Sequence, residues 1–83
     1  MQLEFSQKAL KDIRTIDKIA AKQIVKKLQF FVESPEPLKY AKKLTRFEGG
    51  DYRFRIGVYR IVFDVIDENI YVLRIQHRKE VYK

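Results

Sequence analysis

Residues 51–63 constrain the fold of this chain more than any other segment. Polar and apolar residues alternate from Asp51 to Ile56, and the alternation resumes after the glycine that follows. This pattern is typical of two half-buried strands joined by a tight turn. Glycine readily adopts the positive φ that a type II′ turn requires at its first central position. We therefore predict a β-hairpin with Gly57 and Val58 as its turn.

The position of this turn determines which residues face one another across the hairpin. The predicted pairs are Ile56 with Tyr59, Arg55 with Arg60, Phe54 with Ile61, and Tyr52 with Phe63. One face is then apolar and aromatic, and the other carries Arg53, Arg55 and Arg60. Like charges placed opposite one another destabilise a strand pair, and a local rule broken without compensation indicates a functional position. We interpret the arginines as an anion site suited to a phosphate backbone, with a solvated basic face as the alternative.

The charge balance also favours a polyanionic partner. The 83 residues carry a formal net charge of +7. The segment from Lys39 to Arg60 holds seven basic residues against two acidic ones. Charge alone leaves RNA, DNA and an acidic protein open as partners. We assign RNA contacts to the basic side chains around the hairpin, namely Lys42, Lys43, Arg46 and Arg74.

Length and composition predict a single domain over residues 1–83. The chain has no cysteine, so disulfides and thiolate metal sites are excluded. No apolar run approaches the roughly 20 residues of a membrane span, and the first residues lack the apolar core of a signal peptide. We expect a cytoplasmic protein that does not bind a membrane.

The order of elements predicts an α+β fold with the arrangement βααβββ. Residues 1–5 alternate as an edge strand, and Ser6 and Asp17 are suitable N-caps for two amphipathic helices. Residues 34–37, Ser-Pro-Glu-Pro, end the second helix. Residues 38–50 predict one helical turn or a covering loop. We expect a helical hairpin over one face of a twisted, mostly antiparallel four-stranded sheet, with the arginine face open.

The last predicted strand, residues 70–75, is apolar on both faces, which indicates a central position. Residues 67–69 turn the chain before it. With a three-residue turn Arg74 faces Val62 and joins the arginine face, whereas with a two-residue turn it does not.

The residue inventory restricts the chemistry that an anion site can perform. The chain has one histidine, no glycine-rich phosphate loop, and no cluster with metal-ligand spacing. We therefore expect neither a metal nor a small-molecule cofactor. Guanidinium groups with an imidazole and a phenol can promote attack of an RNA 2′-hydroxyl on its adjacent phosphate. His77 has the only side chain with a suitable unperturbed pKa, and Tyr82 is positioned to stack on a base or donate a proton.

Four segments together resemble the RelE/ParE superfamily of toxins, and most of all its RelE-type members. They are Tyr52–Arg55, Gly57–Phe63, Val65–Asp67 and His77–Tyr82. The resemblance implies a toxin of a type II toxin–antitoxin system that cuts mRNA in the ribosomal A site. Cleavage would proceed by 2′-hydroxyl attack without a metal and leave a cyclic phosphate. A small acidic antitoxin, similar to RelB, would bind and silence the toxin.

The resemblance also implies which residues form the site. Two RelE lysines fall on Arg53 and Arg55, and the arginine of the RelE Gly-Tyr-Arg motif falls on Arg60. A further RelE arginine corresponds to Arg78, with His77 and Arg74 as competitors, and the terminal tyrosine falls on Tyr82.

This chain has arginines at the positions of the two RelE lysines. A lysine that acts as general base in RelE therefore has no counterpart here. Either His77 or Glu80 takes over this role, or the protein cuts slowly, or it binds without cutting. Two other functions stay open: a ParE-type inhibitor of DNA gyrase, and an inactive module that binds antitoxin or RNA.

Overall fold

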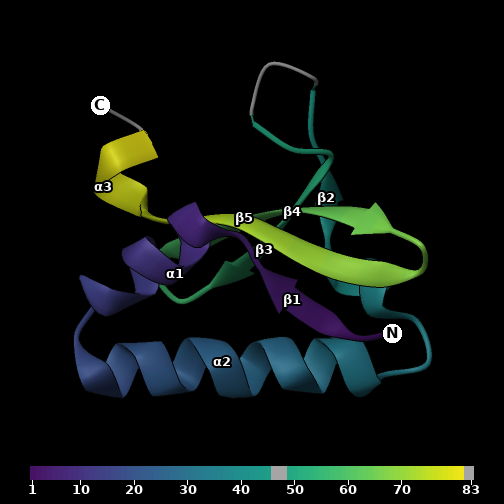
Figure 1. Cartoon of the computed structure of the whole chain (residues 1–83), viewed down its shortest axis with the longest axis horizontal. Coiled ribbons are helices and arrows are strands. Elements are labelled where there is room, and N and C mark those ends of the chain that lie inside the picture. Colours follow the sequence, from purple (N-terminus) through teal and green to yellow (C-terminus); the bar gives the residue numbers. More distant parts are fainter. Residues whose placement is uncertain (46–48, 82–83) are drawn as a thin grey trace.

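The computed structural model describes residues 1–45 and 49–81, apart from the side chains of Glu80 and Val81. Two helices pack on a mostly antiparallel sheet of five strands, which confirms the predicted α+β class (Figure 1). In chain order the elements are β1 (Leu3–Phe5), α1 (Gln7–Arg14), α2 (Lys18–Glu33), the 3₁₀ helix η1 (Pro37–Tyr40), β2 (Lys42–Lys43), β3 (Tyr52–Ile56), β4 (Tyr59–Ile66), β5 (Asn69–His77) and α3 (Arg78–Val81).

Both predicted helix caps are present. The Ser6 side chain accepts a hydrogen bond from the Ala9 N–H at 3.0 Å, and that of Asp17 accepts one from the Ala20 N–H at 3.2 Å. These bonds satisfy backbone donors that have no partner in the first turn of a helix. Ser34 is the C-cap of α2, so the helix ends where the Ser-Pro sequence predicts.

The sheet has one strand more than the sequence predicts. Its order is β1-β5-β4-β3-β2, with β1 parallel to β5 and the other pairs antiparallel. The additional strand, β2, pairs Lys42 with Arg53 and Lys43 with Tyr52. A strand of two residues has no readable periodicity, and only the free edge of β3 makes it a strand. β5 lies inside the sheet as predicted, although β4 is the middle strand.

The arginine hairpin has the predicted register. Arg55 lies opposite Arg60, and Ile56 lies opposite Tyr59. Gly57 has a φ of +58°, whereas Val58 is not among the residues with positive φ, as expected for a type II′ turn.

The apolar face of this hairpin forms the core against the helices. Phe54 and Phe63 are fully buried, and their ring centroids lie 4.4 Å apart. Phe31 of α2 contacts Phe54 with ring centroids 4.6 Å apart. Figure 1 shows α2 lying along one side of the sheet. Burial against this helix leaves the arginine side chains on the opposite face.

The turn before β5 has two residues, yet Arg74 lies where a three-residue turn was expected to place it. Asp67 and Glu68 have φ values of 49° and 64° and form a two-residue turn, with Ile66 opposite Asn69. Arg74 nevertheless lies opposite Val62, because the pairing shifts by one residue between Val62 and Phe63. This shift is a β-bulge that adds one residue to β5.

The face opposite the helices is not entirely open. Val62 in its centre is only 1% exposed. Gly50 passes over it, next to Asp51, whose carbonyl accepts a hydrogen bond from the Leu44 N–H and whose N–H donates to the Asp64 Oδ1, both at 2.8 Å. A Cβ on Gly50 would lie 2.6 Å from the Val62 Cγ1. Glycine at position 50 therefore permits the close approach that covers Val62.

We expect Gly50→Ala to lower the free energy of unfolding by about 1–3 kcal/mol, because the stiff Val62 side chain must move. Urea denaturation measures this loss. Val62→Ala makes room for the added methyl group, so the double variant should lose less stability than the two single losses combined. Simple additivity of the two losses would contradict the contact.

Candidate functional site

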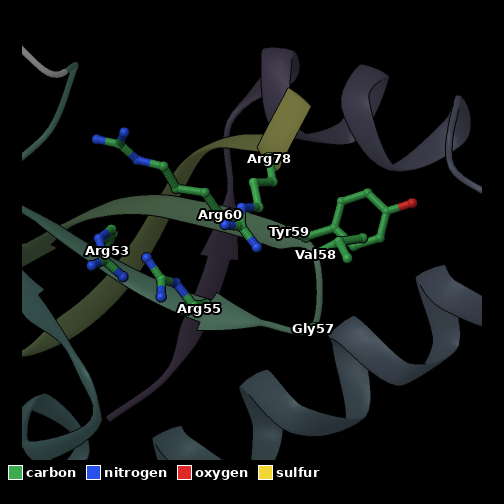
Figure 2. A pocket seen from close by; sticks show the side chains of 7 residues that line it. All are labelled: Arg53, Arg55, Gly57, Val58, Tyr59, Arg60 and Arg78. Atoms are coloured by element: carbon green, nitrogen blue, oxygen red, sulfur yellow. The ribbon is translucent and has the colours of Figure 1, made fainter. Parts of the chain in front are cut away.

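A small pocket of about 40 Å³ opens beside the Gly57–Val58 turn. Its lining consists of Arg53, Arg55, Gly57, Val58, Tyr59, Arg60 and Arg78. Four of the six residues predicted to be catalytic therefore come together in one place. Figure 2 shows their side chains extending from two neighbouring strands and from the start of α3.

The four arginines of this pocket extend from β3, β4 and α3. Arg53 and Arg55 share one face of β3 because side chains two residues apart in a strand point the same way. Arg60 lies opposite Arg55 on β4, and its Nε is buried. Arg78 is at the first position of α3, where its backbone N–H donates to the Val58 carbonyl at 2.7 Å. This bond attaches the start of α3 to the hairpin turn.

The pocket is suited to an anion. Its lining contains four guanidinium groups and, among the described residues, no acidic side chain. Arginine stays charged at neutral pH and presents a planar set of donors that matches phosphate oxygens. Three of these arginines extend from a sheet rather than a loop, which favours a fixed geometry. The arrangement can hold a phosphate group and stabilise additional negative charge on it.

His77 does not join the arginines. It lies opposite Tyr59, and the two ring centroids are 5.3 Å apart in an edge-on contact. Tyr59 packs against the hydrophobic core, and in Figure 2 its ring points away from the arginine side chains. The His77 Nδ1 accepts a hydrogen bond from the Lys79 N–H at 3.0 Å, so the N–H of the neutral imidazole is on Nε2.

Three of the four residues predicted to bind RNA are described, and they lie on two strands. Lys42 and Lys43 are exposed on the edge strand β2. The Arg74 Nε donates to the Asp12 Oδ2 at 2.8 Å, so this arginine helps to join α1 to β5, and RNA contact by it stays a prediction. Arg46 and the predicted catalytic residue Tyr82 lie outside the described residues. The side chain of Glu80, the other candidate base, is also outside the description.

Two polar residues on or against β5 were not predicted from the sequence. Gln76 lies opposite Arg60, on the same face of the sheet. Asp12 of α1 contacts β5 through its carboxylate. The position of Gln76 depends on the bulge, and that of Asp12 depends on how α1 packs. Neither leaves a signal in the periodicity of the chain.

A family model described as the ParE toxin of the type II toxin–antitoxin system, parDE, matches residues 3–82. The chain belongs to the RelE/ParE superfamily of toxins. Among characterised proteins, Toxin RelG of Mycobacterium tuberculosis is 36% identical over 52 residues. That match spans 60% of this chain and 60% of RelG. The chain is accordingly a type II toxin of the RelE/ParE family.

Solved RelE structures share the fold over nearly the whole chain. A chain of the toxin–antitoxin complex RelBE2 of M. tuberculosis is 29% identical, with a TM-score of 0.76 and coverage of 93% of this chain and 96% of that one. The isolated RelE toxin of Escherichia coli is 32% identical, with a TM-score of 0.69 and coverage of 98% and 89%. The predicted resemblance to RelE is confirmed at the level of fold and superfamily.

In the described part of the chain, no group of three or more histidine, cysteine, aspartate or glutamate residues is arranged to hold a metal ion. Over the same residues, no helix has the length and hydropathy needed to cross a membrane.

Proposed function

We propose that this RelE/ParE toxin is a ribosome-dependent endoribonuclease that cuts mRNA in the A site. The observation that carries the proposal is the pocket lined by Arg53, Arg55, Arg60 and Arg78. The fold shared with RelE toxins supports it. We further propose that residues 1–83 act as one toxin domain in the cytoplasm, where translating ribosomes are found.

In the proposed reaction the 2′-oxygen of a nucleotide attacks the adjacent phosphorus. The bond to the 5′-oxygen of the next nucleotide breaks, which leaves a 2′,3′-cyclic phosphate and a 5′-hydroxyl. The 2′-hydroxyl loses its proton and the leaving oxygen gains one. Negative charge grows on the phosphate oxygens in the transition state, and guanidinium groups already in position stabilise it without reorganisation.

The pocket favours charge stabilisation over proton abstraction. Among its described side chains, the arginines are poor bases and the Tyr59 ring points elsewhere. Much of the acceleration must then come from holding the 2′-oxygen in line with the scissile bond, which the ribosome-bound mRNA would provide. Glu80 and Tyr82 are the proposed proton carriers, and His77, whose ring contacts Tyr59, is the alternative.

We also propose that an acidic antitoxin similar to RelB silences the toxin. The RelBE2 relative was solved as a toxin–antitoxin complex. The net charge of +7 on this chain favours an acidic partner.

The test is cell-free translation with purified toxin, followed by primer extension on the mRNA. We expect new 5′ ends inside codons, and only when ribosomes occupy the message. Intact mRNA with normal protein synthesis would refute the proposal. Intact mRNA with stalled synthesis would mean that the toxin occupies the A site but does not cut.

We expect His77→Ala to lower cleavage by less than about threefold, because the ring contacts Tyr59 rather than the arginines. The measurement is the initial rate of mRNA cleavage, with Tyr59→Phe as a control that keeps the ring contact. A loss of about 100-fold or more would instead identify His77 as the proton carrier.

Inhibition of DNA gyrase is the second candidate function, because the matching family model is described as a ParE toxin. A supercoiling assay with purified gyrase separates the two functions. Loss of the supercoiling activity of gyrase at toxin concentrations that leave translation unaffected would favour this candidate.

A further inference from the structure

The bulge in β5 determines which side chain reaches the arginine pocket. Phe63 pairs with Val72, but the preceding residue of β4, Val62, pairs with Arg74. Leu73 is therefore the extra residue, and everything after it is displaced by one position along β4. Without the bulge, continued pairing from Phe63 and Val72 would place His77 opposite Val58. With it, the residue that bonds to the Val58 carbonyl is Arg78.

The same displacement keeps the core apolar. Ile75 pairs with Ile61 in the core and is only 3% exposed. In a register without the bulge, Arg74 would take that position and its charge would face the core, at a large cost in free energy. The apolar pattern of β5 therefore requires one extra residue, but it does not determine the geometry of the bulge.

Asp12 of α1 contacts the bulge directly. Its Oδ2 accepts hydrogen bonds from the Ile75 N–H at 2.9 Å and from the Arg74 Nε at 2.8 Å. Its Oδ1 accepts a third from the Arg74 Nη2 at 3.3 Å. The Asp12 side chain is only 17% exposed, and bonds between charged partners in such a site are shorter and stronger than neutral ones.

Asp12 bonds where β5 has lost its neighbouring strand. β1 pairs only with residues 70–72 of β5. After Val72, no strand pairs with this edge of β5. The Ser6 Oγ donates to the Leu73 carbonyl at 2.9 Å. Two residues further along the same edge, the Ile75 N–H donates to Asp12. Both bonds come from the start and the interior of α1, which replaces β1 as the partner of this edge.

We propose that Asp12 is a positioning residue that acts through the bulge to place Arg78 in the arginine pocket. Its carboxylate sets the path of β5 at Arg74 and Ile75, three residues before Arg78 docks on the hairpin turn. A catalytic consequence rests on the proposed nuclease function, but the positioning of Arg78 does not.

Hydrogen exchange tests the positioning independently of activity. The variants are Asp12→Ala, which removes every acceptor, and Asp12→Asn, which keeps an oxygen for the Ile75 N–H. We expect Asp12→Ala to speed exchange of the Arg78 amide by about tenfold or more relative to the Phe54 amide in the core. Asp12→Asn should restore most of the protection. Equal acceleration at Arg78 and Phe54 would mean general destabilisation and would overturn the proposal.

Cleavage kinetics then test whether the positioning matters for the reaction. We expect Asp12→Ala to lower the cleavage rate by about 10–100-fold, since a displacement near 1 Å in a catalytic group has effects of this size. In an Arg78→Ala background the same substitution should have almost no further effect. Equal losses in both backgrounds would overturn the proposed route through Arg78.

Asp17→Ala is the matched control. It also removes an aspartate that accepts a backbone hydrogen bond on the helical layer, but it lies at the N-cap of α2. It should leave the relative exchange of the Arg78 amide unchanged. If the wild-type protein cuts no mRNA, the nuclease proposal fails while the exchange experiment still decides the role of Asp12.

Discussion

Arg60→Ala is expected to reduce mRNA cleavage by about 100-fold or more, because it removes one of the preorganised donors for the scissile phosphate. We expect Arg60 to have the most fixed position of the four arginines, because it extends from the middle strand and its Nε is buried. The measurement is the single-turnover rate of cleavage in cell-free translation. Affinity for the antitoxin should change little, because the substitution removes a side chain from the pocket without altering the fold.

The control for Arg60→Ala is Arg14→Ala. It removes the same charge from an exposed position in the last turn of α1. We expect its cleavage rate to stay within about threefold of the wild type. Equal losses in both variants would show that total positive charge, rather than the pocket, determines activity.

Phe54→Ala is expected to lower the free energy of unfolding by about 3–5 kcal/mol. The Phe54 ring is fully buried and lies between those of Phe31 and Phe63, with centroids at 4.6 and 4.4 Å. Small domains have about 5–15 kcal/mol of stability in total, so much of the population should unfold under mild conditions. Urea denaturation followed by circular dichroism measures the loss.

Phe30→Ala is the matched control for this core substitution. Phe30 is the neighbour of Phe31 on α2, but its side chain is 53% exposed. The same change of residue type should therefore lower the free energy of unfolding by less than about 1 kcal/mol. Comparable losses for Phe30 and Phe54 would contradict the assignment of Phe54 to the core.

The hairpin and its arginine face were predictable because they depend on local rules. Alternation in a strand has a period of two, and the glycine at 57 determines where the chain reverses. Together these rules placed Arg55 opposite Arg60 before any tertiary contact was known. The N-caps of both helices were predictable for the same reason, since a cap bonds to a backbone group only three residues away.

The position of Arg74 shows where local rules fail. Turn length alone predicted that Arg74 faces Val62 only after a three-residue turn. The chain instead combines a two-residue turn with a bulge, and the two reach the same pairing. A bulge depends on contacts at the strand edge, here with Asp12 more than 60 residues away in sequence.

The sequence by itself determined the helix caps, the hairpin register and the shared face of Arg53, Arg55 and Arg60, because each depends on neighbours within a few residues or on one turn. The tertiary structure decided the rest. It made β2 a strand, covered Val62 on the arginine face with Gly50, brought Arg78 to the pocket and turned His77 toward Tyr59. These features depend on how distant segments pack, and no periodicity within one segment records the edge or side chain that it will meet.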